Sequence, residues 1–111
     1  MIETIIRDYL ITEVTVPVYV DVPAEPPETY VVIERTGGGM EEHIRNAMIA
    51  IQSYGASRYT AAELHERVIA VMQDLITLEN VSSCDLNSEY DFTDTTTKRY
   101  RYQAVFNIVY Y

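Results

Sequence analysis

The sequence predicts an α+β fold in which two helices pack on one face of a mostly antiparallel sheet. Helical and strand-like segments follow one another without the regular alternation that builds a parallel sheet. The last two strand-like segments also match each other as a hairpin. Because 111 residues are enough for one hydrophobic core and too few for two, we expect a single domain over residues 1–111.

The first expected element is a short helix at residues 2–11. Its apolar residues recur at the three- and four-residue spacing of one helical face, and they are Ile2, Ile5, Ile6, Tyr9 and Leu10. A helix this short is not stable alone in water, so it must dock on the rest of the chain.

Residues 14–20 predict a strand, since β-branched side chains dominate there. Pro17 has no amide hydrogen to donate, so this segment should be either an edge strand of the sheet or an extended arm. Residues 21–28 hold three of the four prolines and predict an extended, acidic loop.

Residues 29–36 predict the next strand, whose apolar centre Tyr30–Ile33 is expected to be covered on both faces. Residues 44–54 fit either a helix or a strand. A strand is preferred, because Gly37–Gly39 then lie near the tip of a hairpin that joins the two segments.

A second helix is predicted from Thr60 to about Glu79–Asn80. Thr60 and Glu63 have the spacing of a capping box, in which each side chain satisfies a free backbone amide. An apolar stripe follows, made of Leu64, Val68, Val71, Met72, Leu75 and Leu78.

Residues 84–92 and 99–111 predict a closing hairpin around the polar turn Thr93–Lys98. Matching the apolar faces of the two strands sets one register, with the pairs Phe92–Tyr100, Tyr90–Tyr102, Leu86–Phe106 and Cys84–Ile108. The same register places Asp91 opposite Arg101.

The charge balance argues against two kinds of partner. The chain has 17 acidic and 8 basic residues, which gives a formal charge of −9. Nucleic acids and anionic membranes bind positively charged protein surfaces. No segment reaches the ~18 apolar residues that cross a bilayer, and the start Met-Ile-Glu-Thr lacks the pattern of a signal peptide. The one cysteine, Cys84, excludes a disulfide within the chain. We therefore expect synthesis in a reducing cytoplasm, with no specific nucleic-acid binding and no membrane partner.

Tyrosine usage indicates contact surfaces. The chain has 10 tyrosines, no tryptophan and only 2 phenylalanines. Tyrosine offers a large contact area with a polar tip and is enriched in protein interfaces, although small β-rich domains also use it on half-exposed strands.

Two segments are superficially similar to ligand-binding loops. Gly37–Gly39 lack the lysine and hydroxyl residues of a phosphate loop and run into Glu41 and Glu42, which would repel phosphate. The spacing of four acidic or amide residues is similar to the start of a calcium loop, and these are Asp85, Asn87, Glu89 and Asp91. That loop needs glycine at its sixth position and glutamate at its twelfth, where Tyr90 and Thr96 stand.

The remaining reactive residue types are scattered. His43 and His65 each stand alone, and His65 is expected on the solvated face of the second helix. Cys84 is expected to face the core, where a thiol reacts poorly. The basic cluster of Lys98, Arg99 and Arg101 is explained by pairing with Asp91 across the hairpin. We predict no catalytic residues, no cofactor and no metal, and hence a protein that is not an enzyme.

The candidate site is instead an interface loop that is mobile in the free protein and orders against a neighbour. Three glycines favour this, because their ordering costs the most backbone entropy. The residues of this candidate loop are Thr36, Gly37, Gly38, Gly39, Met40, Glu41 and Glu42.

Several stretches together match one known pattern. The strand Tyr30–Ile33 continues through Glu34-Arg35-Thr36 into Gly37-Gly38, a strand around Ile44–Tyr54 and the helix Thr60–Leu78 follow, and Arg101-Tyr102-Gln103-Ala104 begins the last strand. In this order of motifs, over nearly its whole length, the chain resembles the tail terminator or tail completion proteins, minor tail proteins of siphophage-type bacteriophages.

The resemblance implies a structural protein of the virion, placed at the head-proximal end of the tail. Such proteins form a ring, hexameric in the virion, that caps the tail tube, stops its polymerisation and presents the surface for head joining. The implied partners are further copies of the chain, the tail tube protein and a head-completion or connector protein, with a monomer in free solution left open. Acidic residues toward the channel would keep passing DNA from adhering.

Two alternatives remain open from the sequence. The chain could be a neighbouring neck or head–tail connector protein, since such proteins share its size and general pattern. It could also be a small cytosolic α+β module that binds a ligand.

Overall fold

Five strands form one sheet in the computed structural model of the chain, which describes residues 1–111. The strands are β1 (Val18–Tyr19), β2 (Tyr30–Glu41), β3 (Ile44–Gly55), β4 (Val81–Asp91) and β5 (Tyr100–Tyr110). Their order across the sheet is β1-β2-β3-β5-β4, and only β1 pairs in parallel. The predicted α+β fold with a mostly antiparallel sheet is therefore confirmed.

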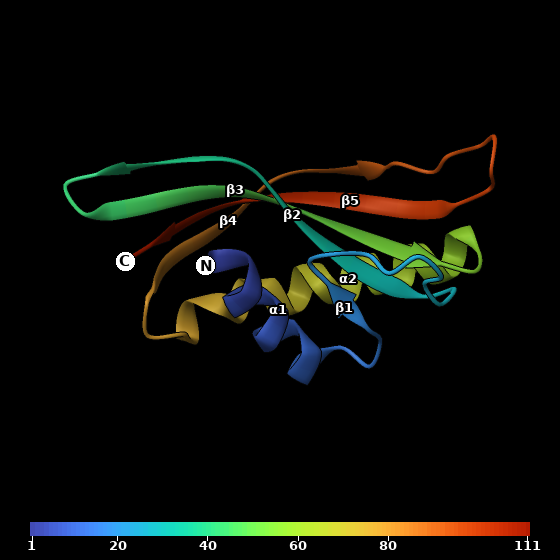
Figure 1. Ribbon diagram of the computed structural model, residues 1–111, viewed down its shortest axis with the longest axis horizontal. Coiled ribbons are helices and arrows are strands. Elements are labelled where there is room, and N and C mark those ends of the chain that lie inside the picture. Colours follow the sequence, from blue (N-terminus) through green and yellow to red (C-terminus); the bar gives the residue numbers. More distant parts are fainter.

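Both helices lie on the same face of this sheet, as predicted (Figure 1). They are α1 (Ile2–Glu13) and α2 (Arg58–Met72), and α2 continues as the 3-10 helix η1 (Gln73–Thr77). Hence the second helical segment ends close to the predicted boundary, with its last turn wound more tightly. The opposite face of the sheet carries no helix.

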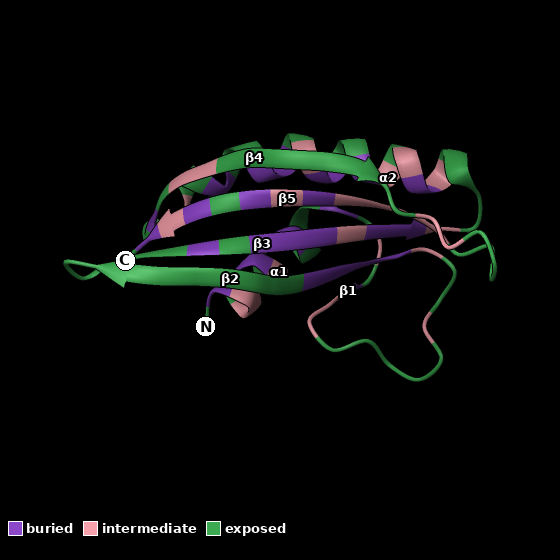
Figure 2. Cartoon of the chain, turned by 90° about the horizontal axis from the view of Figure 1, so that it is seen from above, coloured by how far each residue is buried: buried purple, intermediate pink, exposed green.

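The core lies between the helices and the sheet. From α1 it takes Ile2, Ile6 and Leu10, one residue from each successive turn. Residues of alternate positions in the central strands meet them, and the largest fully buried ones are Phe106, Ile33, Ile49, Ile51 and Ile108. Figure 2 shows this as buried stretches in β3, β5 and the first part of β2, whereas β4 and the distal hairpin are mostly exposed.

The first strand is an edge strand, as predicted, but it is shorter than residues 14–20. Only Val18 and Tyr19 pair with β2, opposite Val31 and Val32. The carbonyl of Pro17 accepts a hydrogen bond from the amide of Val31, at 2.9 Å. Because Pro17 itself has no amide hydrogen, the ladder begins only after it.

The β2–β3 hairpin is longer than predicted, and its tip lies elsewhere. Gly37–Gly39 are inside β2 and pair with Ala47 and its neighbours on β3, so the prediction of a glycine tip is wrong. The turn is formed by Glu42 and His43, at φ 51° and 69°. Positive φ at both central residues is the geometry whose twist matches paired strands, which explains why two non-glycine residues adopt it.

Helix α2 starts before the predicted cap. Its first residue is Arg58, and the Ser57 hydroxyl accepts a hydrogen bond from the Thr60 amide at 3.1 Å. The predicted Thr60–Glu63 capping box is thus wrong, because Ser57 already occupies the capping position. The predicted apolar stripe is confirmed at Val68 and at the residues that follow it, Val71, Met72 and Leu75.

The β4–β5 hairpin keeps half of its predicted register. Cys84 pairs with Ile108 and Leu86 with Phe106, as predicted. A bulge between Leu86 and Ser88 then shifts the register by one residue, so that Asp91 lies opposite Tyr102 and not opposite Arg101. The predicted pairs Tyr90–Tyr102 and Phe92–Tyr100 are wrong for the same reason, since an extra residue turns the rest of the strand over.

Candidate interaction surfaces

The helix-free face of the sheet carries a row of aromatic side chains. Tyr30 and Tyr54 stack with ring centroids 4.4 Å apart and planes 6° from parallel, and Tyr19 meets Tyr30 edge-on at 5.9 Å. Across the sheet, Tyr90 and Phe92 pack edge-on at 5.6 Å. With Val32, the tyrosines at the β1 side form a second, smaller hydrophobic cluster apart from the main core.

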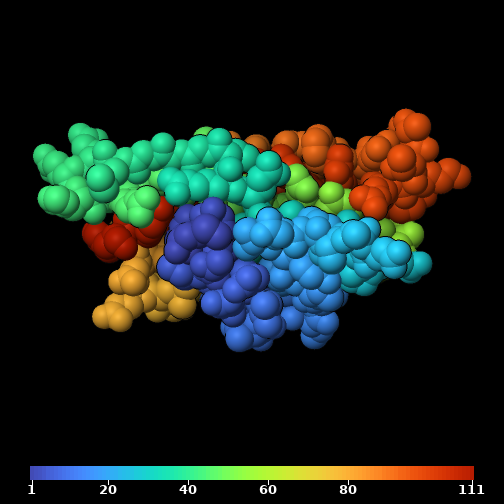
Figure 3. Space-filling view, viewed as in Figure 1, coloured from blue at the N-terminus to red at the C-terminus, as the bar shows by residue number.

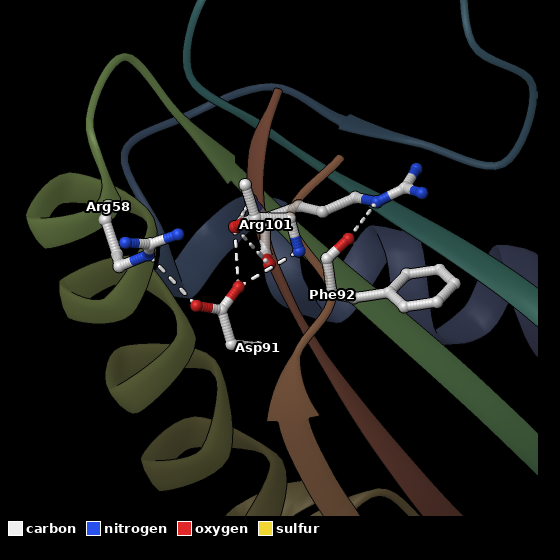
Figure 4. Close-up of polar contacts among 5 residues, drawn as sticks. Arg58, Asp91, Phe92 and Arg101 are labelled. Carbon is white, nitrogen blue, oxygen red and sulfur yellow. Dashed lines mark hydrogen bonds and ion pairs between the residues drawn. The ribbon is translucent and has the colours of Figure 1, made fainter. Parts of the chain in front are cut away.

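Arg101 on β5 joins the two ends of this aromatic row. Its guanidinium lies over the Phe92 ring, 4.3 Å from the centroid, and donates to the Tyr54 hydroxyl at 2.8 Å. Its Nε atom also donates to the carbonyl of Phe92 at 2.8 Å, as Figure 4 shows. A planar guanidinium can stack and donate at once, so it fixes three strands relative to one another.

Asp91 pairs with the helix and not with the neighbouring strand. Its carboxylate lies 3.0 Å from Nε of Arg58, so the predicted Asp91–Arg101 pair is wrong (Figure 4). The hydroxyl and the amide of Thr93 donate to the same carboxylate, and they hold the pKa of Asp91 below its usual range, with Arg58 contributing less. This network ties the end of β4 to the start of α2.

A pocket of about 300 Å³ opens at this end of the sheet. The Tyr30–Tyr54 stack lines it on one side, and Pro26 and Pro27 of the acidic loop line another. Two further lining residues, Lys98 and Arg99, are exposed and form no ion pair with any residue of the chain. The predicted basic cluster is thus divided: Arg101 is engaged in the sheet, whereas the other two cations are free.

The residues of the candidate interface loop, Thr36–Glu42, lie at the opposite end of the molecule. All of them are exposed, but they form the distal half of β2 and the turn residue Glu42. The hairpin extends beyond the helical layer in Figure 1 and protrudes in the space-filling view of Figure 3. Its tip combines Glu41 and Glu42 with two exposed apolar side chains, Met40 at 67% and Ile44 at 44% of their full exposure.

His65 lies in the core and not on a solvated face, so that prediction is wrong. It is 2% exposed, and its Nε2 atom lies 2.9 Å from Oε1 of Glu89. The bulge in β4 turns Glu89 toward the helices, and the imidazole also packs on Tyr102. A carboxylate partner explains how a polar ring is accommodated there.

These residues are also the only cluster of metal-ligating type. The ligand atoms of His65, Glu66 and Glu89 lie within 4.8 Å of one another. One imidazole and two exposed carboxylates fall short of the four ligands of a structural zinc site. The buried Nδ1 atom of His65 has no partner that would orient the ring for a metal. The trio is better described as a helix-to-sheet contact, and the absence of a metal site stays a prediction.

Cys84 packs against the core, as predicted from its position in the strand. Burial, and secondarily the neighbouring Asp85 carboxylate, raises the pKa of Cys84 to about 12. A thiol that stays protonated is a poor nucleophile. Of the ten tyrosines, Tyr59, Tyr90 and Tyr111 are largely exposed, so the tyrosine content serves both the sheet and the surface.

No model of a known protein family matches the chain, and no curated protein sequence matches it either. None of its helices is both long enough and apolar enough to cross a membrane. Sequence reasoning found the hairpin residues and the basic cluster but missed the pocket, whose only signal was the proximity of the prolines to Tyr30.

Proposed function

We propose that this chain is a structural subunit of a bacteriophage virion that acts as a tail terminator. In this role a ring of copies, hexameric by resemblance, caps the head-proximal end of the tail tube. The ring stops tube polymerisation and presents the surface to which the head, through a completion or connector protein, attaches.

One observation carries the proposal: each copy has two different unpartnered surfaces at opposite ends. The β2–β3 hairpin protrudes at one end, and the pocket with its free cations opens at the other. Contacts between unlike surfaces are heterologous, and they close into a ring when the rotation between copies allows it. The helix-free sheet face leaves a further surface for tube or connector protein.

The charge supports the same role. With −9 on each copy, a ring would present a negative lining to DNA that passes through its channel. The exposed edge strand β4 contributes Asp85, which forms no ion pair within the chain. Charged side chains on an edge strand also oppose indiscriminate strand pairing, so assembly would be limited to specific contacts.

Tube assembly with and without the chain tests the proposal. Tail tubes polymerised in the presence of the chain should stop at a defined length, and tubes from phage that lack it should be overlong or lack heads. Tubes of normal length without the chain would contradict the terminator role. Binding to the head and not to the tube would favour the neighbouring neck or connector role instead.

The pocket supports a second candidate function, that of a ligand-binding module. Its volume lies at the lower limit of small-molecule sites. A chain that stays monomeric, leaves tube ends bare and binds a small anionic ligand in this pocket would favour that function over the ring.

A further inference from the structure

We infer that the acidic tip of the β2–β3 hairpin of one copy docks into the basic, tyrosine-lined pocket of the next copy. This inference deepens the proposed ring and rests on it. It names the two surfaces that join adjacent copies, and it commits the pocket to a second copy of this chain as its occupant.

The tip and the pocket carry opposite charges. Glu41 and Glu42 at the tip form no ion pair within the chain, and neither do Lys98 and Arg99 at the pocket. The pocket also includes one carboxylate, that of Glu28, so its cations outnumber its anions. Opposite charges at two separate surfaces favour their association and fix its orientation.

The tip and the pocket also have matching apolar parts. The tip exposes Met40 and Ile44, and the pocket offers Pro27, Ala56 and Tyr100 beside the buried rings of Tyr30 and Tyr54. Interfaces of this kind pair an apolar centre with a charged rim. A pocket of about 300 Å³ suits a side chain or two from a narrow two-residue turn.

The length of the molecule keeps the tip of a chain away from the pocket of the same chain. The tip and the pocket lie at opposite ends of a molecule 45 Å long, so one chain cannot satisfy its own contact (Figures 1 and 3). Only the tip of another copy can reach the pocket. Repeating the contact gives a chain of copies that closes when the rotation per copy divides a full turn.

Sedimentation of charge variants tests the contact. Glu41→Lys with Glu42→Lys should weaken self-association by about tenfold or more, and so should Lys98→Glu with Arg99→Glu. The tip variant is the more informative of the two. It lowers the net negative charge of −9, which by itself would promote association, so weaker association would have to come from the lost contact. Combining all four changes in one chain restores complementarity and should restore association.

The matched control changes the same number of charges elsewhere. Asp8→Lys with Asp74→Lys alters two exposed carboxylates of the helical layer and should not weaken association. Circular dichroism of each variant establishes that it is folded. A mixture of Glu41→Gln/Glu42→Gln with Lys98→Gln/Arg99→Gln chains should give a one-to-one dimer that grows no further, because one intact tip meets one intact pocket.

Each other outcome overturns the inference. Tip variants that associate like wild type, a fourfold variant that fails to recover, or a wild type that is monomeric at every concentration would each do so. Loss of association in the pocket variant alone would mean that the pocket contacts a surface of the next copy other than the hairpin tip. A chain that still ends tail tubes despite any of these results would leave the terminator role standing and remove only this contact.

Discussion

Arg101 shows how a single side chain organises the helix-free face. It stacks on Phe92, donates to the Tyr54 hydroxyl and donates to a backbone carbonyl of the neighbouring strand. Hydrogen bonds from a charged donor contribute more than neutral ones, and all three contacts depend on the planar guanidinium. Its neighbour Arg99 has the same charge but no ion pair.

Arg101→Ala should therefore lower the free energy of unfolding by about 1–3 kcal/mol, because the Tyr54 and Phe92 partners lose their charged donor. Arg99→Ala serves as the control and should change it by less than about 0.5 kcal/mol. Urea denaturation of both variants measures the difference. Equal midpoints would mean that Arg101 does not hold the row together.

Cys84 offers a second residue-level prediction, from a pKa raised to about 12. At pH 8 the folded protein should react with a thiol reagent far more slowly than the urea-unfolded chain, whose thiol has its ordinary pKa. Well below pH 9 the thiol is mostly protonated in both states. As pH rises toward 12 the unfolded thiol ionises first, so folding stability from this group falls. Equal reaction rates for the folded and unfolded chains at pH 8 would show that the thiol is not buried.

At the level of the elements, two adjacent residues of the 3-10 helix η1 differ sharply in burial. Leu75 is fully buried, whereas Ile76 is 54% exposed. Leu75→Ala should cost about 2–5 kcal/mol through lost burial and the cavity left behind, and Ile76→Ala should cost much less. Denaturant midpoints compare the two, and a Leu75→Ala midpoint equal to that of wild type would remove η1 from the core.

The β2–β3 hairpin allows a similar comparison between adjacent glycines. A Cβ atom at Gly38 would lie 2.5 Å from the carbonyl oxygen of Asn46 on β3, whereas one at Gly37 would meet nothing within 4 Å. Gly38→Ala should thus force the strands apart at a cost of about 1–3 kcal/mol, and Gly37→Ala should be tolerated. Amide hydrogen exchange across residues 37–48 measures the separation of the strands, and protection should fall in the Gly38→Ala variant only. Equal protection in both variants would show that the strands do not approach so closely.

The elements that were predictable are those whose signal is local. The spacing of Ile2, Ile6 and Leu10 is enough to identify α1, and alternation identifies most strand positions. The turn at Glu42 and His43 was not predictable, because the pair lacks the Asn, Asp or Gly that such turns favour and three glycines nearby suggest a better tip.

The β4 bulge and its consequences were also not predictable from the sequence. Nothing in the sequence around Leu86 marks an extra residue in the ladder, and yet the bulge decides which way Glu89 and Asp91 face. The burial of His65 follows from Glu89, and the loss of the Asp91–Arg101 pair follows from the shifted register. Long-range pairing thus determined the sites that local patterns misplaced.

At the scale of the whole molecule, two electrostatic effects oppose each other during assembly. Copies that each carry −9 repel one another over long distances, whereas the tip and the pocket attract only near contact. The Debye length falls from about 30 Å at 0.01 M salt to about 8 Å at 0.15 M. Moderate salt therefore removes more of the repulsion than of the contact attraction, and rings should be favoured at 0.15 M over 0.01 M.

The most direct test of the account is electron microscopy of tail tubes incubated with the purified chain at about 0.15 M salt. We predict one additional ring of density at a single end of each tube, with the sides and the other end bare. Tubes whose two ends both stay bare, or tubes decorated along their sides, would contradict the claim that this chain terminates the tail.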